Sequence, residues 1–290
     1  MTKKQGALIS IISNTSLMTM KVIAGLITNS ISIISEAIHS LIDLTASIVA
    51  FIAIKKALKP PDEDHPYGHG KYESISGFFE GILIFLAASL IIYESIKRII
   101  EGIHIEEIEI GIAVMLISGG INLIVSSVLF NISKKEESLA LKTDALHLST
   151  DVLTSVGVGL GLLIINFTKL TILDPIIAII IALIIIRASI NLLKETIQEL
   201  SDKSLPENEL EEIKNIINSN PDVLEFHKLR TRKIGKQREI DFHLVLREEI
   251  TLLEGHKISH IISDRIQERF PESKVTIHIE PHGEDKLGED

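Results

Sequence analysis

The sequence predicts a membrane-embedded bundle of six helices, followed by a small α+β domain outside the membrane. Six apolar stretches are each long enough to cross a bilayer, which takes roughly 20 helical residues at about 1.5 Å each. The segments between them are short and polar. From about Ser201 the hydropathy falls sharply, and short helix and strand patterns replace the long apolar runs. We therefore divide the chain into a membrane domain, residues 1–200, and a C-terminal domain, residues 201–290.

The composition of the 290 residues fits this organisation and excludes several classes of function. Mean hydropathy is +0.32, aromatic residues make up 4% and tryptophan is absent, which is typical of a membrane protein with a soluble part. The absence of cysteine excludes disulfides, thiolate metal sites and cysteine-based catalysis. A net charge of −10 gives no electrostatic footprint for nucleic acid. The N-terminal MTKKQGALISII lacks a small-residue cleavage site, so we expect it to begin the first span.

The apolar runs define the expected spans. The first two are joined by little more than Thr28-Asn29-Ser30, which predicts an antiparallel pair of helices. Pro206 marks the end of the membrane helices. The expected spans cover residues 7–28, 31–57, 74–100, 108–132, 141–167 and 172–196.

Basic residues near the span ends predict the orientation, because cytoplasmic loops carry an excess of Lys and Arg. One side has only Lys97, Arg98 and Lys169, and the other has Lys3, Lys4, Lys55, Lys56, Lys59, Lys71, Lys134, Lys135 and Lys142. We therefore expect a multi-pass protein of the cell membrane with both termini in the cytoplasm. Lys21 falls within the first span, nearer its outer end. We expect its side chain to extend to the membrane surface rather than to pair with an intramembrane carboxylate.

Two spans carry the same pattern of ionisable residues. EAIHSLID places His39 four residues before Asp43, and DALHLSTD places His147 four residues before Asp151. Residues four apart stack on one face of a helix. Ionisable groups are costly in hydrocarbon, so we expect them to face a partner or a water-filled path. Two imidazoles and two carboxylates, brought together by helix packing, would supply four ligands of the kind that a divalent metal prefers, and zinc in particular.

A membrane histidine that stands alone can equally be a hydrogen-bonding group between helices. We expect Asn14 and Asn122 to act in that way. Two His-x-x-x-Asp pairs in separate spans favour a metal site over this alternative. In both copies an acidic residue also lies three positions before the histidine: Glu36 before His39, and Asp144 before His147.

The segment between the second and third spans, KPPDEDHPYGHGKYES, offers a second set of ligands. Its prolines and glycines exclude a continuous helix. Asp62, His65 and His69 lie three and four residues apart in this tight loop, which is a plausible local metal site. The alternative is a merely polar loop rich in turn residues. A site this exposed should bind metal less tightly than a closed one.

The C-terminal domain reads as helix, strand, strand, helix, strand. Residues 207–219 show apolar residues at helical spacing, and VLEFHKLRTR and REIDFHLVLR read as a hairpin. A helix at about 252–269 and a strand at 274–280 follow. This order predicts two helices on a mostly antiparallel sheet.

Histidines are concentrated in this domain. His278, Glu280 and His282 are spaced by two, so on a strand they share one face while Val275, Ile277 and Ile279 occupy the other. A sheet face that carries these ligands could bind one or more metals. Histidines that merely decorate the surface are the alternative.

At these residues the chain resembles the cation diffusion facilitator family of metal–proton antiporters. The resemblance covers nearly the whole length and rests on HSLID, DALHLSTD, DHPYGHGKYES, LDPI, HKLRTR and VTIHIEP. It implies a homodimer of six-span protomers with cytoplasmic domains of ferredoxin-like fold. It also implies a transport site of His39, Asp43, His147 and Asp151 and a loop site of Asp62, His65 and His69. The cytoplasmic metal ligands that it implies are His227, His243, His256, His278 and Glu280.

Together these features predict an efflux transporter rather than an enzyme. Its substrates would be Zn²⁺, or else Cd²⁺, Co²⁺ or Fe²⁺, and protons, with metal also acting as a regulatory ligand and no prosthetic group. Some bacterial members of the family have Asp where this chain has His39, and nitrogen ligation favours zinc or cobalt over manganese. The main alternative is a membrane-anchored metal sensor or scaffold that binds zinc without transport. A metalloenzyme would need an open coordination position, and a tight four-ligand site disfavours a channel.

Overall fold

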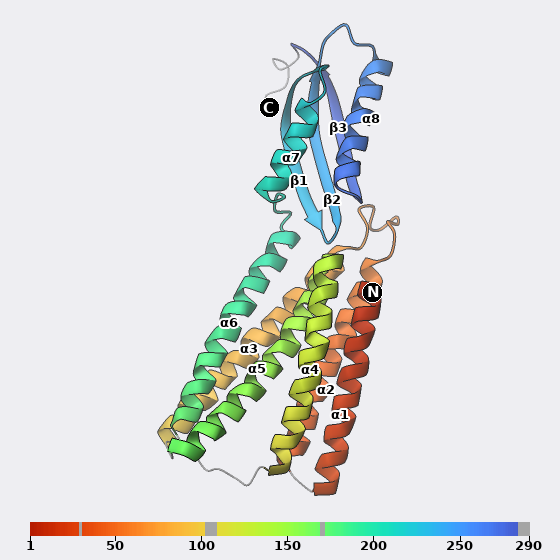
Figure 1. The fold of residues 1–290 in the computed structure, drawn as a ribbon. Coiled ribbons are helices and arrows are strands. Elements are labelled where there is room, and N and C mark those ends of the chain that lie inside the picture. The colour runs from red at the N-terminus through yellow and green to blue at the C-terminus, as the bar shows by residue number, and fades with distance from the viewer. Residues whose placement is uncertain (29–30, 102–108, 169–171, 284–290) are drawn as a thin grey trace. The chain divides into compact units, whose positions relative to one another are not determined.

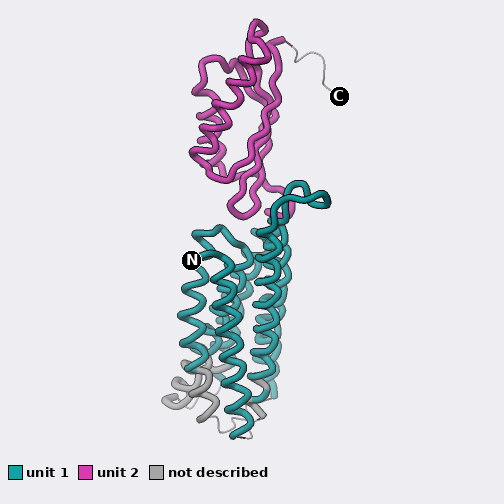
Figure 2. Tube along the Cα trace, turned by 90° about the vertical axis from the view of Figure 1, so that its right-hand side faces the viewer, with its two compact units in different colours: residues 1–197 teal, residues 198–290 magenta. Residues whose placement is uncertain are grey.

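The computed structural model describes residues 1–28, 31–101, 109–168 and 172–283. Within some helices only the backbone is described, and Glu36 is among the side chains outside that description. The chain divides into two compact units, residues 1–197 and residues 198–290 (Figure 2).

The first unit contains six long helices that run side by side (Figure 1). Their limits agree with the expected spans to within a few residues at most ends. Among the described side chains, all of these helices except α5 contain a stretch long and apolar enough to cross a membrane. The six helices are α1 (Lys3–Thr28), α2 (Ile31–Ala57), α3 (Lys71–Glu101), α4 (Glu109–Glu136), α5 (Leu139–Thr168) and α6 (Leu173–Leu200).

The packing of these helices matches a lipid environment. Buried apolar residues from α1, α2, α4 and α5 form one cluster, which includes Ala7, Ile54, Leu129 and Leu148. A second cluster joins α3 to α6. Many large aliphatic side chains point away from the bundle and are exposed. Such a surface is unfavourable in water but favourable against hydrocarbon, and helices suit that environment because they satisfy most backbone hydrogen bonds internally.

The second unit has the element order that the sequence predicts. It consists of α7 (Glu207–Asn218), β1 (Val223–Ile234), β2 (Gln237–Leu246), α8 (Leu252–Arg269) and β3 (Ser273–Pro281). The strands form one sheet in the order β1-β2-β3 (Figure 1). Ile213 of α7, Phe242 of β2 and Ile262 of α8 belong to one core, so both helices cover the same face of the sheet.

The prediction of a mostly antiparallel sheet holds for only one of the two strand pairs. β1 and β2 are antiparallel, with Ile234 paired to Gln237 across a two-residue turn. Gly235 opens this turn at a φ of 59°, which glycine adopts at low cost. β3 pairs with β2 in parallel. Parallel neighbours need a long crossover connection, and α8 supplies it.

Candidate metal sites in the two units

Two of the four predicted membrane ligands lie on one face of α2 and the other two on one face of α5, and these helices are in contact. Nε2 of His147 lies 3.0 Å from Oδ1 of Asp43, which is hydrogen-bond distance. Asp43, His147 and Asp151 each offer a ligand atom, and these atoms lie within 4.8 Å of one another. The side chains of Asp43 and His147 are only 6% and 13% exposed. Helical spacing aligned each pair, and the contact between α2 and α5 joins the two pairs.

His39 stands at the edge of this group. Its Nε2 lies 3.8 Å from Oδ1 of Asp43, and its side chain is 51% exposed. It lines the same small cavity as Asp43 and Asp151, with a volume of about 100 Å³. A modest movement of the imidazole would therefore complete a set of two nitrogen and two oxygen ligands, the donor set that suits zinc.

Two asparagine side chains make hydrogen bonds between helices near this group, and one of them reaches a candidate ligand. Nδ2 of Asn122 on α4 donates to Oδ2 of Asp151 at 3.3 Å. Nδ2 of Asn14 on α1 donates to Oγ of Ser47 on α2 at 2.7 Å. Both asparagines thus make the interhelical hydrogen bonds expected of them. Asn122 in addition orients a candidate metal ligand, a role that its position in the sequence does not reveal.

A second buried polar layer lies one helical turn from the four ligands. Ser47 follows Asp43 by four residues on α2, and its Oγ donates to Oδ1 of Asp144 at 3.2 Å. Oδ2 of Asp144 and both carboxylate oxygens of Glu80 are buried and have no hydrogen-bond partner among the described residues. Sequence reasoning missed Glu80. The one signal that could have found it is an acidic residue amid the apolar run of the third span.

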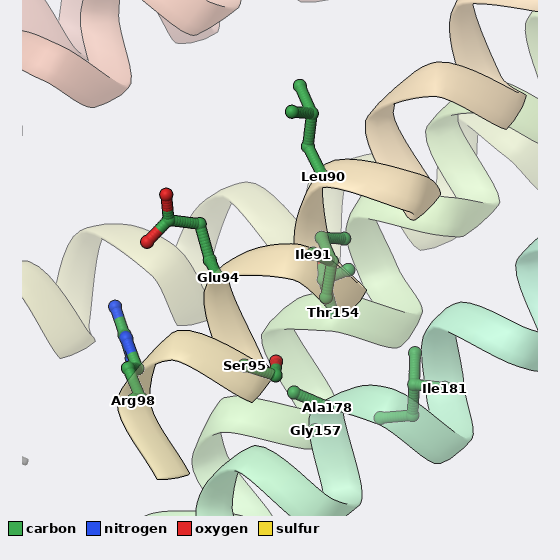
Figure 3. A pocket seen from close by; sticks show the side chains of 9 residues that line it. All are labelled: Leu90, Ile91, Glu94, Ser95, Arg98, Thr154, Gly157, Ala178 and Ile181. Atoms are coloured by element: carbon green, nitrogen blue, oxygen red, sulfur yellow. The ribbon is translucent and has the colours of Figure 1, made fainter. Parts of the chain in front are cut away.

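A larger cavity in the membrane unit lies elsewhere, and the residues that line it do not supply a set of metal ligands. It has a volume of about 310 Å³ and lies between α3, α5 and α6. Figure 3 shows aliphatic side chains in its wall together with polar ones, among them Glu94 and Arg98 on successive turns of α3. One carboxylate without a histidine cannot form the donor set described above. Size therefore does not identify the metal site, whereas the convergence of ligands does.

The loop between α2 and α3 brings its three predicted ligands together. Asp62, His65 and His69 form a group whose ligand atoms lie within 4.8 Å of one another. Nε2 of His69 is 3.3 Å from Oδ2 of Asp62, and the backbone N–H of His65 donates to Oδ1 of Asp62 at 2.8 Å. That backbone hydrogen bond lowers the pKa of the Asp62 carboxyl. Gly68, at a φ of +92°, allows the chain to turn back on itself here.

In the second unit, the three strands align histidines in one row. His227 pairs with His243 across β1 and β2, and His243 pairs with His278 across β2 and β3. Nδ1 of His243 and Nε2 of His227 lie 2.5 Å and 2.7 Å from the two carboxylate oxygens of Glu280. Partial burial raises the pKa of Glu280, but the hydrogen bonds from His243 and His227 outweigh it and hold the pKa below its usual value. These three residues form the third candidate metal group.

The remaining predicted ligands of this unit are not gathered into that group. His278 is adjacent, with its ring centroid 4.6 Å from that of His243, and its side chain is 64% exposed. His256 is exposed on α8, where its ring lies 4.5 Å from that of His260. His282 is exposed just beyond β3. Within one chain, therefore, His256 and His282 stand apart from the cluster of His227, His243 and Glu280.

We expect Glu280→Gln to weaken zinc binding at the sheet cluster by at least about tenfold. The substitution keeps the size of the side chain but removes the anionic oxygens between His227 and His243, and even outer partners of metal sites contribute about 10–100-fold. Competition between the full-length protein and a chromogenic chelator measures this change. Glu268→Gln, at an exposed position on α8, is the matched control. Equal zinc affinity in the two variants would contradict the assignment.

The fold and the sites define a class of protein, a multi-pass membrane protein that gathers nitrogen and oxygen ligands for divalent cations. Comparison with known proteins agrees. Residues 7–201 match the family model described as cation efflux transmembrane domain, and residues 205–282 match that of the cation efflux protein, cytoplasmic domain. The chain belongs to the cation diffusion facilitator family. It is therefore a divalent metal efflux transporter, and the family is one of transporters rather than enzymes.

Several relatives match nearly the whole chain. An uncharacterised transporter of Synechocystis, sll1263, is 37% identical over 95% of this chain and 89% of its own length. Protein p34 of Rickettsia rickettsii is 31% identical over 97% of this chain and 92% of its own length. The cation-efflux pump FieF of Citrobacter koseri is 31% identical over 91% and 88%. A solved structure of CzrB is 33% identical over 28% of this chain and 100% of that chain, with a TM-score of 0.27.

Proposed function

We propose that this protein exports Zn²⁺ from the cytoplasm in exchange for protons. The observation that carries the proposal is the convergence of Asp43, His147 and Asp151, whose ligand atoms lie within 4.8 Å of one another inside the membrane unit. His39 completes the set as the fourth ligand. Two imidazoles and two carboxylates match the preference of zinc and favour it over manganese.

The spacing of the ligands explains how a metal and a proton can exchange. Nε2 of His147 and Oδ1 of Asp43 are 3.0 Å apart, a distance that suits one shared proton. Two ligands of a tetrahedral zinc ion lie roughly 3.3 Å apart, given bonds of about 2.0–2.1 Å. Zinc can thus replace the proton with only a small displacement. Because imidazole and carboxylate must lose protons before they ligate, loading the metal releases protons and protonation releases the metal.

Transport requires the site to face each side of the membrane in turn. We place the loop of Asp62 and both termini in the cytoplasm, in keeping with the excess of Lys and Arg on that side. Zinc enters from there, and the ligand pairs on α2 and α5 then move relative to the rest of the bundle so that the site opens outward. Protons from outside displace the metal. The unperturbed pKa of histidine, about 6.5, suits this exchange near neutral pH.

The C-terminal domain is assigned a regulatory role in a homodimer. The site of His227, His243 and Glu280 binds zinc as its concentration in the cytoplasm rises, and so acts as a sensor of internal metal. His256 and His282, which stand apart from this cluster within one chain, are assigned to sites completed by a second copy. Closure of the two domains around zinc then favours the transport-competent state, because a ligand shifts an equilibrium toward the state that it binds better.

The test is zinc flux into proteoliposomes of the full-length protein under an imposed pH gradient. We expect flux to follow the gradient, to reverse with it and to fall when an ionophore collapses it. Flux that depends only on the zinc gradient would overturn proton coupling. No flux, with zinc still bound by the protein, would favour a sensor or scaffold instead.

A further inference from the structure

Lys21 of α1 is buried inside the membrane unit, although the sequence led us to expect that it extends to the membrane surface. That prediction is wrong. Only 7% of the residue is exposed. Its Nζ donates to Oγ of Ser40 at 2.8 Å, and Ser40 is itself buried. The amine thus lies beside α2, where it contacts Ser40, the residue that follows His39.

The position of Lys21 places it in the transport cavity itself. The same cavity of about 100 Å³ is lined by Lys21, His39, Ser40, Asp43 and Asp151. Lys21 and the candidate ligand Asp151 therefore line one cavity, although they come from different helices, α1 and α5. The cavity therefore contains the amine of a lysine together with the residues proposed to bind the transported cation.

A charged lysine cannot ligate a metal, since its nitrogen has no free lone pair. In a small buried cavity its effect on other charges is large, because solvent screens it little. It compensates part of the carboxylate charge whenever no metal is bound. It also opposes the entry of a second cation. Both effects lower the affinity for metal and favour release.

We propose that Lys21 is a resident counter-ion of the transport site, which stabilises the carboxylates of Asp43 and Asp151 in the absence of metal and weakens zinc binding so that the ion can leave. The proposal rests on the transport function proposed above. The flexible four-carbon stem of lysine allows the ammonium group to move toward the carboxylates when zinc leaves and back toward Ser40 when it returns. The alternative is a structural role only, as a hydrogen-bonded link between α1 and α2.

Two substitutions separate these roles by the sign of the effect. Lys21→Met removes the charge and keeps the length, whereas Lys21→Arg keeps the charge. A nearby unit charge changes the affinity of a buried group for a proton by about 10- to 1,000-fold, so we expect Lys21→Met to lower the KM for zinc by about tenfold or more. The maximal rate should fall as well, because release becomes slow. Lys21→Arg retains a positive charge, so its KM for zinc should not fall as that of Lys21→Met does.

The measurement is the initial rate of zinc uptake into proteoliposomes against zinc concentration, at one fixed pH gradient. A KM that is raised or unchanged in Lys21→Met would overturn the proposal, as would an equal fall in KM in Lys21→Met and Lys21→Arg. Ser40→Ala adds a control, since it removes the hydrogen bond but keeps the charge and should not tighten binding. If Lys21→Met does not yield monodisperse protein, Lys21→Gln replaces it, because glutamine can still donate to Ser40 without a charge.

Failure of the transport function is distinguishable from failure of this proposal. If the original protein binds zinc at the membrane site without moving it, the zinc affinity of the full-length protein is measured by chelator competition, with His147→Ala defining the contribution of the other sites. Tighter binding in Lys21→Met then still supports a resident counter-ion. Unchanged or weaker binding overturns it.

Discussion

Asp43→Asn is expected to reduce zinc transport by at least about 100-fold while leaving the protein folded. Oδ1 of Asp43 faces both histidines, at 3.0 Å from Nε2 of His147 and 3.8 Å from Nε2 of His39. An amide preserves the shape but has no charge to offset the metal. Substituting even outer partners of metal ligands costs about 10–100-fold, so the loss of a direct anionic ligand should cost more. Zinc flux in proteoliposomes measures the effect.

A suitable control for this experiment is Glu94→Gln. Glu94 is also a carboxylate of the membrane unit, but it is exposed on α3 and lines the larger cavity, which lacks histidines. We expect its substitution to change flux by less than about twofold, in keeping with the small effects of exposed positions. If Asp43→Asn transported zinc as well as Glu94→Gln, the metal path would have to lie elsewhere.

For the proposed transport site, the sequence predicted the arrangements that depend only on local geometry. The spacing of His39 to Asp43, and of His147 to Asp151, places each pair on one helical face whatever the tertiary fold. That the two pairs meet was inferred from the cost of ionisable groups in hydrocarbon and not from a pattern. Asn122 and Lys21 contribute to the same site from α4 and α1. No periodicity links them to it, because only helix packing brings these positions together.

The C-terminal unit shows the same division between local and long-range information. Alternation along β2 accounts for which of its residues face the core, since Phe242 is buried there and the next residue, His243, lies on the opposite face. Alternation cannot give the register between strands, and it is the register that places His227, His243 and His278 in one row. The parallel pairing of β3 was missed for a related reason. Strand direction depends on where the chain re-enters the sheet after α8, and the strand sequence does not encode it.

Phe242→Ala is expected to destabilise the C-terminal unit by about 3–5 kcal/mol, the usual cost of truncating a buried phenylalanine. Phe242 is only 1% exposed and packs in the core formed by α7, β2 and α8. Its ring meets that of Phe226 edge to face, with centroids 6.4 Å apart. Few of these contacts can be replaced by relaxation, because both helices and the sheet converge on this residue. Hydrogen exchange of the β2 amides in the full-length protein measures the loss.

This substitution also tests whether the two units act independently in binding metal. His243 is the next residue on the same strand, so a looser core should disturb the cluster of His227, His243 and Glu280 and weaken zinc binding there. The membrane ligands belong to the other unit and should retain their affinity. Leu252→Ala, at a residue 88% exposed, is the control and should change stability by less than about 0.5 kcal/mol. Equal protection of the β2 amides in both variants would show that Phe242 does not anchor the core. If Phe242→Ala also lost zinc at the membrane ligands, the folding of one unit would control metal binding in the other.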